Sequence, residues 1–160
     1  MPASERMTSD VHKRVLVVDD DDEVRKILTA ALVRHGLDVD YAYDGEQALA
    51  LLREQTYAVV LLDLLMPNMD GFSVLDVLNT DSMQSPPVVL VLTGADNSVV
   101  DRLNPQRIHG LVRKPFDPQD LAALVVACSD IKRRGTFEAM ALATMVSGAP
   151  LLAWLNRFGG

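Results

Sequence analysis

Short apolar runs alternate along this chain with longer segments in which apolar residues recur every three or four positions. The runs cover 15–18, 59–62, 88–92 and 108–113, while 38–43 alternates apolar and polar residues. Continuous apolar runs are typical of strands buried on both faces of a parallel sheet, and alternation is typical of a strand exposed on one side. The pattern therefore predicts five strands, with 38–43 at an edge.

The segments between these runs have helical spacing and recognisable ends. Helices are expected to start at Asp21 or Asp22, after Gly45, at Phe72, before Pro105 and at Pro118. The fourth should be short because a proline disrupts a helix interior. The fifth has Asp117 as a suitable N-cap and Pro118 as a suitable first residue. Alternating strands and helices with short connections predict an α/β fold, with a parallel sheet covered on both faces.

Three acidic residues stand where two of the predicted strands end. Asp19 and Asp20 follow the first run, and Asp63 follows the run 59–62. The carboxyl ends of parallel strands meet at one edge of the sheet, so these carboxylates should share a site. At roughly 5 Å, each pair would repel by about 3 kcal/mol. A bound Mg²⁺, or alternatively Mn²⁺, would remove that cost, whereas the alternative role of such acids is to cap the following helices.

A hydroxyl and a cation end two further strands. Thr93 follows the run 88–92, and Lys114 follows the run 108–113. These groups have a clear use if Asp63 becomes phosphorylated, because an aspartyl phosphate carries about two negative charges and three acceptor oxygens. The sequence thus predicts a phosphorylated aspartate whose charge is shared by a metal ion, Lys114 and Thr93.

Four motifs in this order resemble the receiver domain of two-component response regulators over residues 13–134. They are Val18-Asp19-Asp20, Asp63 with Met66-Pro67-Asn68-Met69-Asp70-Gly71, Thr93-Gly94, and Lys114-Pro115-Phe116. The resemblance implies a flavodoxin-like fold with strand order 2-1-3-4-5. It also implies a phosphorylation-regulated protein with output through protein–protein interaction. The expected partners are a histidine kinase or phosphotransfer protein and a downstream protein target.

The resemblance also implies a role for each site residue. Asp63 would accept the phosphoryl group, while Asp19, Asp20, Asp63 and the backbone carbonyl of Leu65 would hold Mg²⁺. Lys114 would pair with the phosphate, Thr93 would move toward it, and Pro115 is a candidate cis-proline. On this interpretation the protein is not an enzyme for a separate substrate. It catalyses only its own phosphorylation and its slow autodephosphorylation.

Three positions depart from the family pattern. Leu111 stands three residues before Lys114, where receivers often carry an aromatic residue that turns inward. We therefore expect phosphorylation to change the outer surface only modestly. Leu65 and Ala95 occupy positions whose side chains help to place the attacking water in the family. Neither side chain can hydrogen-bond water, so we expect slow self-dephosphorylation.

Composition and the chain ends complete the prediction. The net charge of −7 disfavours nonspecific binding to nucleic acid. About twenty-five residues follow Gly135, fewer than a DNA-binding domain needs, so no direct DNA binding is expected. The single Cys128 and the lack of a secretory signal favour a cytoplasmic protein.

The two ends of the chain are expected to lie outside the receiver fold. Residues 1–12 are small, polar and charged, which predicts a flexible tail. Residues 135–160 form an apolar helical extension with three alternatives. In the first alternative, the extension packs on the receiver or on a partner subunit, as in a homodimer. In the second it is the remnant of a longer protein, and in the third it spans a membrane. The membrane span ranks last because glycine, proline and alanine make the stretch weakly lipophilic.

Two other functions compete with the receiver interpretation. Residues 20–24 superficially match the nucleophile motif of the haloacid-dehalogenase phosphatases, which also use Mg²⁺. That alternative gives no role to Asp63, and turnover of small phosphate esters would distinguish it. A phosphate-independent interaction module on a receiver fold is the other alternative. The intact set of acids, hydroxyl and lysine argues against it.

Overall fold

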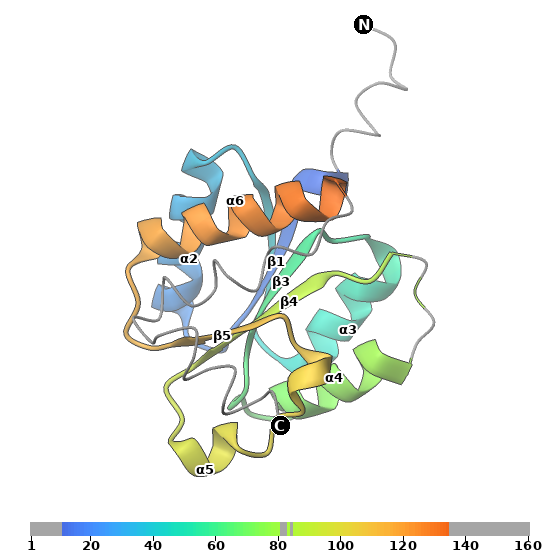
Figure 1. Ribbon diagram of the computed structural model, residues 1–160. Coiled ribbons are helices and arrows are strands. Elements are labelled where there is room, and N and C mark those ends of the chain that lie inside the picture. Colours follow the sequence, from blue (N-terminus) through green and yellow to red (C-terminus); the bar gives the residue numbers. More distant parts are fainter. Residues whose placement is uncertain (1–10, 81–82, 84, 135–160) are drawn as a thin grey trace, which may run out of the picture.

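A five-stranded parallel sheet forms the centre of the molecule (Figure 1). The computed structural model describes residues 11–80, 83 and 85–134. The strands are β1 (Arg14–Val18), β2 (Asp38–Ala42), β3 (Val59–Asp63), β4 (Val88–Thr93) and β5 (Gly110–Arg113). Their order is β2-β1-β3-β4-β5, and every neighbouring pair is parallel. The predicted flavodoxin-like order and the edge position of β2 are confirmed.

Helices connect the strands and cover both faces of the sheet. They are η1 (Val11–Lys13), α2 (Asp22–Arg34), α3 (Gly45–Glu54), α4 (Gly71–Thr80), α5 (Asn97–Val100), η2 (Pro105–Arg107) and α6 (Pro118–Arg134). In Figure 1, α2 and α6 lie together on one face, and α3 and α4 lie on the other. The fourth predicted helix is a single turn, α5, and Pro105 starts the separate 3-10 turn η2.

Two apolar clusters hold these layers together. Leu28 and Leu32 of α2 and Leu121 of α6 belong to the cluster on one face of the sheet. Leu49 of α3 and Val74 of α4 belong to the cluster on the opposite face. Complete burial of a leucine or valine side chain contributes about 1.5–3 kcal/mol. The two clusters therefore pack against both faces of β1, β3 and β4 and fix the positions of their carboxyl ends.

Aspartates cap the helices that begin beside those strand ends. Asp21 accepts hydrogen bonds from Glu23 and Val24 amides at the start of α2, and Asp44 accepts from the Gln47 amide at the start of α3. Asp96 caps α5 and Asp117 accepts from the first amides of α6 in the same manner. Each such cap is worth about 1 kcal/mol. Helix capping thus explains several acidic residues that take no part in the acidic cluster described below.

The structure describes only part of the two segments expected at the ends of the chain. Of the tail expected at residues 1–12, Val11 and His12 begin the 3-10 helix η1, and the Ser129 hydroxyl donates to the His12 carbonyl. The rest of that tail and the extension 135–160 lie outside the described residues. Within 11–80, 83 and 85–134, no helix has both the length and the apolar character needed to cross a bilayer.

Candidate functional site

Three carboxylates meet at the carboxyl ends of β1 and β3. Asp63 is the last residue of β3, and Asp19 directly follows β1, whose Val18 pairs in register with Leu62. Carboxylate oxygens of Asp19, Asp20 and Asp63 all lie within 4.8 Å of one another. Asp19 and Asp63 are buried, and Asp20 is exposed. The structure thus brings together the three acids that the sequence placed at one edge of the sheet.

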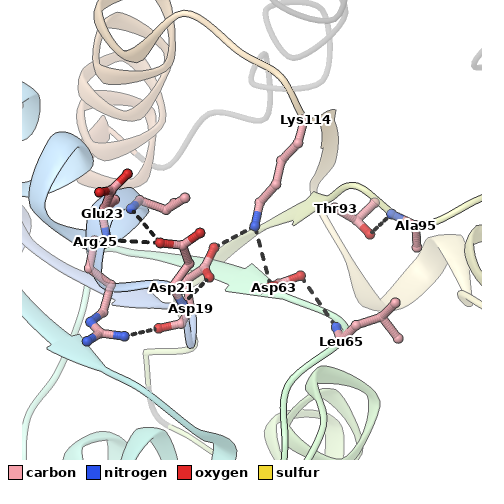
Figure 2. A network of polar contacts seen from close by, with 10 residues as sticks. Asp19, Asp21, Glu23, Arg25, Asp63, Leu65, Thr93, Ala95 and Lys114 are labelled. Carbon is pink, nitrogen blue, oxygen red and sulfur yellow. Dashed lines mark hydrogen bonds and ion pairs between the residues drawn. The ribbon is translucent and has the colours of Figure 1, made fainter.

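The ammonium group of Lys114 reaches into this cluster from the end of β5 (Figure 2). Its Nζ donates to Asp19 Oδ2 at 2.7 Å and to Asp63 Oδ2 at 3.4 Å. The Lys114 backbone amide donates to the Thr93 carbonyl at 2.9 Å, which anchors the residue beside β4. One positive charge therefore faces three negative ones, and the cluster retains an excess of negative charge.

The charges and the burial of this cluster shift the pKa values of Asp63 and Lys114. Burial raises the pKa of Asp63, the charge of Asp19 raises it further, and Lys114 acts in the opposite direction. Burial alone would lower the pKa of Lys114, but its hydrogen bond to Asp19 and the charges of Asp19 and Asp63 raise it overall. Lys114 is therefore positively charged at neutral pH. The negative charge of Asp63, in contrast, is only partly balanced by nearby positive groups.

Thr93, the last residue of β4, is fully buried next to this cluster. Its Oγ1 accepts a hydrogen bond from the Ala95 amide at 3.0 Å (Figure 2). The hydroxyl oxygen is thus engaged with the loop that follows β4. Ala95 itself is buried and offers only a methyl group.

The loop after β3 is built tightly around Asp63. The Leu65 amide donates to Asp63 Oδ1 at 3.4 Å, and the residue is 52% exposed. Asn68 adopts a φ of 65°, a left-handed conformation that asparagine tolerates better than most residues. The Gly71 amide then donates to the Leu64 carbonyl at 2.9 Å and closes the loop. Leu65 lies directly beside Asp63, with its side chain toward solvent.

Two further predicted residues follow from β5. Leu111 is partly buried and packs against the cluster on the α3 and α4 face, so it does not join the acids. The peptide bond between Lys114 and Pro115 is cis. Phe116 packs against the opposite cluster, beneath α2 and α6.

Sequence reasoning missed two arginines that hold the site from outside. Arg25 of α2 donates from Nη1 to the Asp19 carbonyl at 2.6 Å (Figure 2). It also pairs with Asp22. Arg113 donates to the Ala95 carbonyl at 2.5 Å and also to Asn97 Oδ1. One signal was available, because Arg113 is a charged residue directly before Lys114 in an otherwise apolar strand.

Comparison with known proteins identifies the same architecture elsewhere. The family model of the response regulator receiver domain matches residues 15–126. The DNA-binding response regulator MtrA of Mycolicibacterium smegmatis is 38% identical over 117 residues, which are 73% of this chain and 50% of MtrA. This chain spans about half the length of the curated relatives that it matches.

Solved structures agree with the sequence relatives. The receiver domain of the Francisella response regulator 1452 aligns with a TM-score of 0.66 and 27% identity, over 74% of this chain and 97% of that one. The chemotaxis response regulator CheY4 of Vibrio cholerae aligns with a TM-score of 0.65 and 28% identity. That match covers 72% of this chain and 97% of CheY4.

These relatives correct one expectation, namely that the protein makes no direct contact with DNA. That prediction was wrong, since relatives of this chain such as MtrA are named DNA-binding response regulators. It rested on the acidic net charge and on the few residues after Gly135. The matched region is only about half of each such relative, so the charge of this region carries no information about what the other half binds.

Proposed function

Because this chain belongs to the response regulator receiver domain family, we propose that it is regulated by phosphorylation of Asp63, with a histidine kinase as the phosphoryl donor. One observation carries the proposal. Three carboxylates lie within 4.8 Å of one another, and the Lys114 ammonium bridges the two buried ones. A purely structural cluster would not need a buried carboxylate that is short of positive charge.

Phosphoryl transfer needs a nucleophile and compensation of charge on the phosphoryl oxygens. A carboxylate oxygen of Asp63 forms a bond to phosphorus while the bond from phosphorus to the donor nitrogen breaks, and its electrons leave with the imidazole. Lys114 already lies 3.4 Å from Asp63 Oδ2, so it pairs with the incoming oxygens without leaving the site. The Thr93 hydroxyl turns from Ala95 and donates to one of these oxygens.

The acidic cluster also suits a divalent cation. Its donors are all carboxylate oxygens, the ligands preferred by Mg²⁺ and Mn²⁺, and one lysine leaves part of their charge uncompensated. Asp19, Asp20 and Asp63 would hold the ion, with the Leu65 carbonyl as a fourth protein ligand. When bound, the ion supplies positive charge for the phosphoryl oxygens. Magnesium is therefore the cofactor that we propose.

Apart from its own phosphorylation, we propose no turnover of a separate substrate. The phosphoryl group is lost slowly, because the side chains of Leu65 and Ala95 cannot hydrogen-bond a water molecule. We also propose a cytoplasmic location. The chain has a single cysteine, Cys128, which is buried and forms no disulfide, and this suits a reducing compartment.

Labelling with a small phosphoryl donor tests this function. The full chain is incubated with Mg²⁺ and acetyl phosphate, and the mass of the intact protein is measured. We expect a single phosphoryl addition to the wild type and none to Asp63→Asn. Asp44→Asn serves as the control, since Asp44 is a buried aspartate that caps α3, and asparagine caps equally well. It should be labelled like the wild type.

Four results would contradict the proposal or part of it. Absence of label on the wild type would exclude phosphoryl acceptance, and equal labelling of Asp63→Asn would place the acceptor elsewhere. Continuous release of phosphate from small phosphate esters would instead support a phosphatase. Labelling without Mg²⁺ at the same rate would remove the role of the metal ion.

A further inference from the structure

Arg113 makes an unusual set of contacts at the end of β5. It pairs in register with Thr93 across the two strands and is half-buried. Its guanidinium donates from Nη1 to the Ala95 carbonyl at 2.5 Å and from Nη2 to Asn97 Oδ1. The pKa of Asp96 is lowered chiefly by its hydrogen bond with Ser98, and the charge of Arg113 contributes. One side chain thus holds residues 95–97, the loop that follows Thr93.

Ala95 is bonded on both sides of its backbone in this arrangement. Its amide donates to Thr93 Oγ1 at 3.0 Å, and its carbonyl accepts from Arg113. The Thr93 carbonyl accepts from the Lys114 amide at 2.9 Å. Arg113, the last residue of β5, and Lys114, which follows it, therefore hold the segment 93–95 at two points. The position of the Thr93 hydroxyl and the contact with Arg113 are linked through Ala95.

Movement of the Thr93 hydroxyl has a consequence for this linkage. If Thr93 turns toward a phosphoryl group on Asp63, the Ala95 amide loses its acceptor. Ala95 is buried, and a buried amide without a partner is unfavourable. Ala95 keeps this partner only if it moves with Thr93, and such a movement changes the contact between its carbonyl and the Arg113 guanidinium.

We propose that Arg113 is a positioning residue that latches the loop 95–97 in its resting conformation and so opposes the switch of Thr93. This inference rests on the proposed function, and it assigns regulation of the same site. Arg113 contacts the loop, and it acts on the phosphorylated aspartate only through Thr93 and Ala95. Its contacts set what fraction of molecules has the loop ready for a phosphoryl group.

A latch and a contact that stabilises both conformations equally predict different affinities after the contact is removed. A tie that stabilises the resting and switched conformations equally does not change the affinity for a phosphoryl mimic. A latch favours the resting conformation only, so its removal raises the binding-competent fraction and tightens apparent binding. A variant that merely loses structure would bind more weakly. Tighter binding is therefore a signature that damage to the fold cannot produce.

The experiment is a titration of the full chain with beryllofluoride in Mg²⁺, followed by amide chemical shifts. We expect the apparent Kd of Arg113→Gln to fall about fivefold, which corresponds to one ordinary hydrogen bond lost from the resting state. Arg113→Lys keeps the positive charge but lacks the planar fork that reaches two acceptors. Its Kd should also fall, which separates loss of the fork from loss of charge.

Two further variants locate the effect in the loop. Asn97→Ala removes one acceptor of the latch, and its effect should be less than additive with that of Arg113→Gln, because both act on one contact. Arg107→Gln is the matched control. Arg107 is an exposed arginine that pairs with Asp76 at 2.6 Å, outside the loop, and its loss should leave the Kd unchanged.

The outcomes separate this inference from the proposed function. If the wild type binds beryllofluoride and Asp63→Asn does not, the function stands. An unchanged or weaker affinity of Arg113→Gln would then overturn the latch alone. If the wild type does not bind, or Asp63→Asn binds equally well, the proposed function fails and the latch fails with it.

Discussion

Leu65 is the residue that we expect to limit the access of water to Asp63. Asp63 is buried, while Leu65, two residues later, is half-exposed and donates its amide to Asp63 Oδ1. Its exposed side chain lies at the solvent-facing end of the loop that follows Asp63. A leucine there offers no hydrogen bond that would orient a water molecule for attack, and we expect it to keep water from the phosphoryl group.

Replacement of this leucine by a polar residue should shorten the lifetime of the phosphorylated protein. We expect Leu65→Asn to lose its phosphoryl group about tenfold faster than the wild type, or about 1.4 kcal/mol of activation free energy. The measurement is the decay of labelled phosphate after the donor is removed. Leu65→Met, which stays apolar, is the control and should decay like the wild type. Equal rates for Leu65→Asn and the wild type would show that this side chain does not limit hydrolysis.

At the residue scale, the sequence located what stands at strand ends and missed what depends on side-chain direction. Asp19, Asp63 and Lys114 each follow an apolar run, and parallel strands bring such positions together. Arg113 also stands at a strand end, but its function could not be predicted. Its contacts with Ala95 and Asn97 depend on the direction and reach of its side chain. His109 was likewise not predictable. Its Nδ1 accepts the Val89 amide at 3.0 Å and takes the place of a strand carbonyl.

At the element scale, the approach of α4 to β3 determines the shape of the site. Gly71 is the first residue of α4, and it is buried against the end of β3. A Cβ atom at this position would lie 2.3 Å from the Asp63 carbonyl oxygen and 2.8 Å from the Leu64 Cα. These are backbone atoms, which cannot give way as a flexible side chain can. Only glycine allows the helix to start so close to Asp63.

Gly71→Ala should therefore both destabilise the fold and disturb the site. We expect the free energy of unfolding to fall by about 2–3 kcal/mol, typical of an overpacked core position. Urea unfolding followed by circular dichroism measures this change. The matched control is Gly94→Ala, where the nearest atom to a new Cβ is the Lys114 Cβ at 3.9 Å, an ordinary contact. Its stability should stay within about 0.5 kcal/mol of the wild type, and similar losses in both variants would contradict the packing argument.

Element positions were more predictable than element lengths. Asp21 and Asp117 cap α2 and α6 as the sequence indicated, because capping is a local interaction between an aspartate and the next two or three amides. The fourth helix could be recognised as short from Pro105, but its reduction to a single turn could not. Strand β5 begins at Gly110. His109, directly before it, donates its backbone amide to the Val89 carbonyl at 2.8 Å but accepts the Val89 amide through its ring and not through a backbone carbonyl, so the regular ladder starts one residue later.

At the scale of the whole molecule, the sheet order could not be obtained from periodicity. The apolar runs predicted five parallel strands and two covered faces, but a right-handed α/β sheet admits several orders. The order β2-β1-β3-β4-β5 was implied only by the family resemblance and is confirmed. It places β1 next to β3, and this neighbourhood brings Asp19 and Asp63 together. The acidic site therefore depends on the strand order. Repulsion between its carboxylates opposes the stability of the whole fold.

The ionised form of Asp63 is a cost to folding in the absence of a cation. Its pKa is raised by burial and by Asp19, with Lys114 offsetting part of the effect. A carboxyl whose pKa is higher in the folded protein binds its proton more tightly there. Its stabilising contribution is therefore present below the unfolded pKa, about 3.8, and is lost as the pH rises through the folded value. At neutral pH the metal-free protein should be less stable than it would be with a neutral group at this position.

Asp63→Asn should accordingly stabilise the metal-free protein at pH 7. At 4.8 Å, the upper separation within the cluster, two carboxylates repel by about 3 kcal/mol, and Lys114 offsets most of this. We expect a net gain of about 1 kcal/mol in the free energy of unfolding, measured by urea denaturation with a chelator present. Mg²⁺ at ten times its Kd should stabilise the wild type by about 1.4 kcal/mol and Asp63→Asn by less, because the variant lacks one ligand. Asp44→Asn, which removes a buried carboxylate outside the cluster, should show the Mg²⁺ response of the wild type. A metal-free Asp63→Asn protein that is less stable than the wild type would mean that Asp63 stabilises the fold, and the electrostatic basis of the site would have to be abandoned.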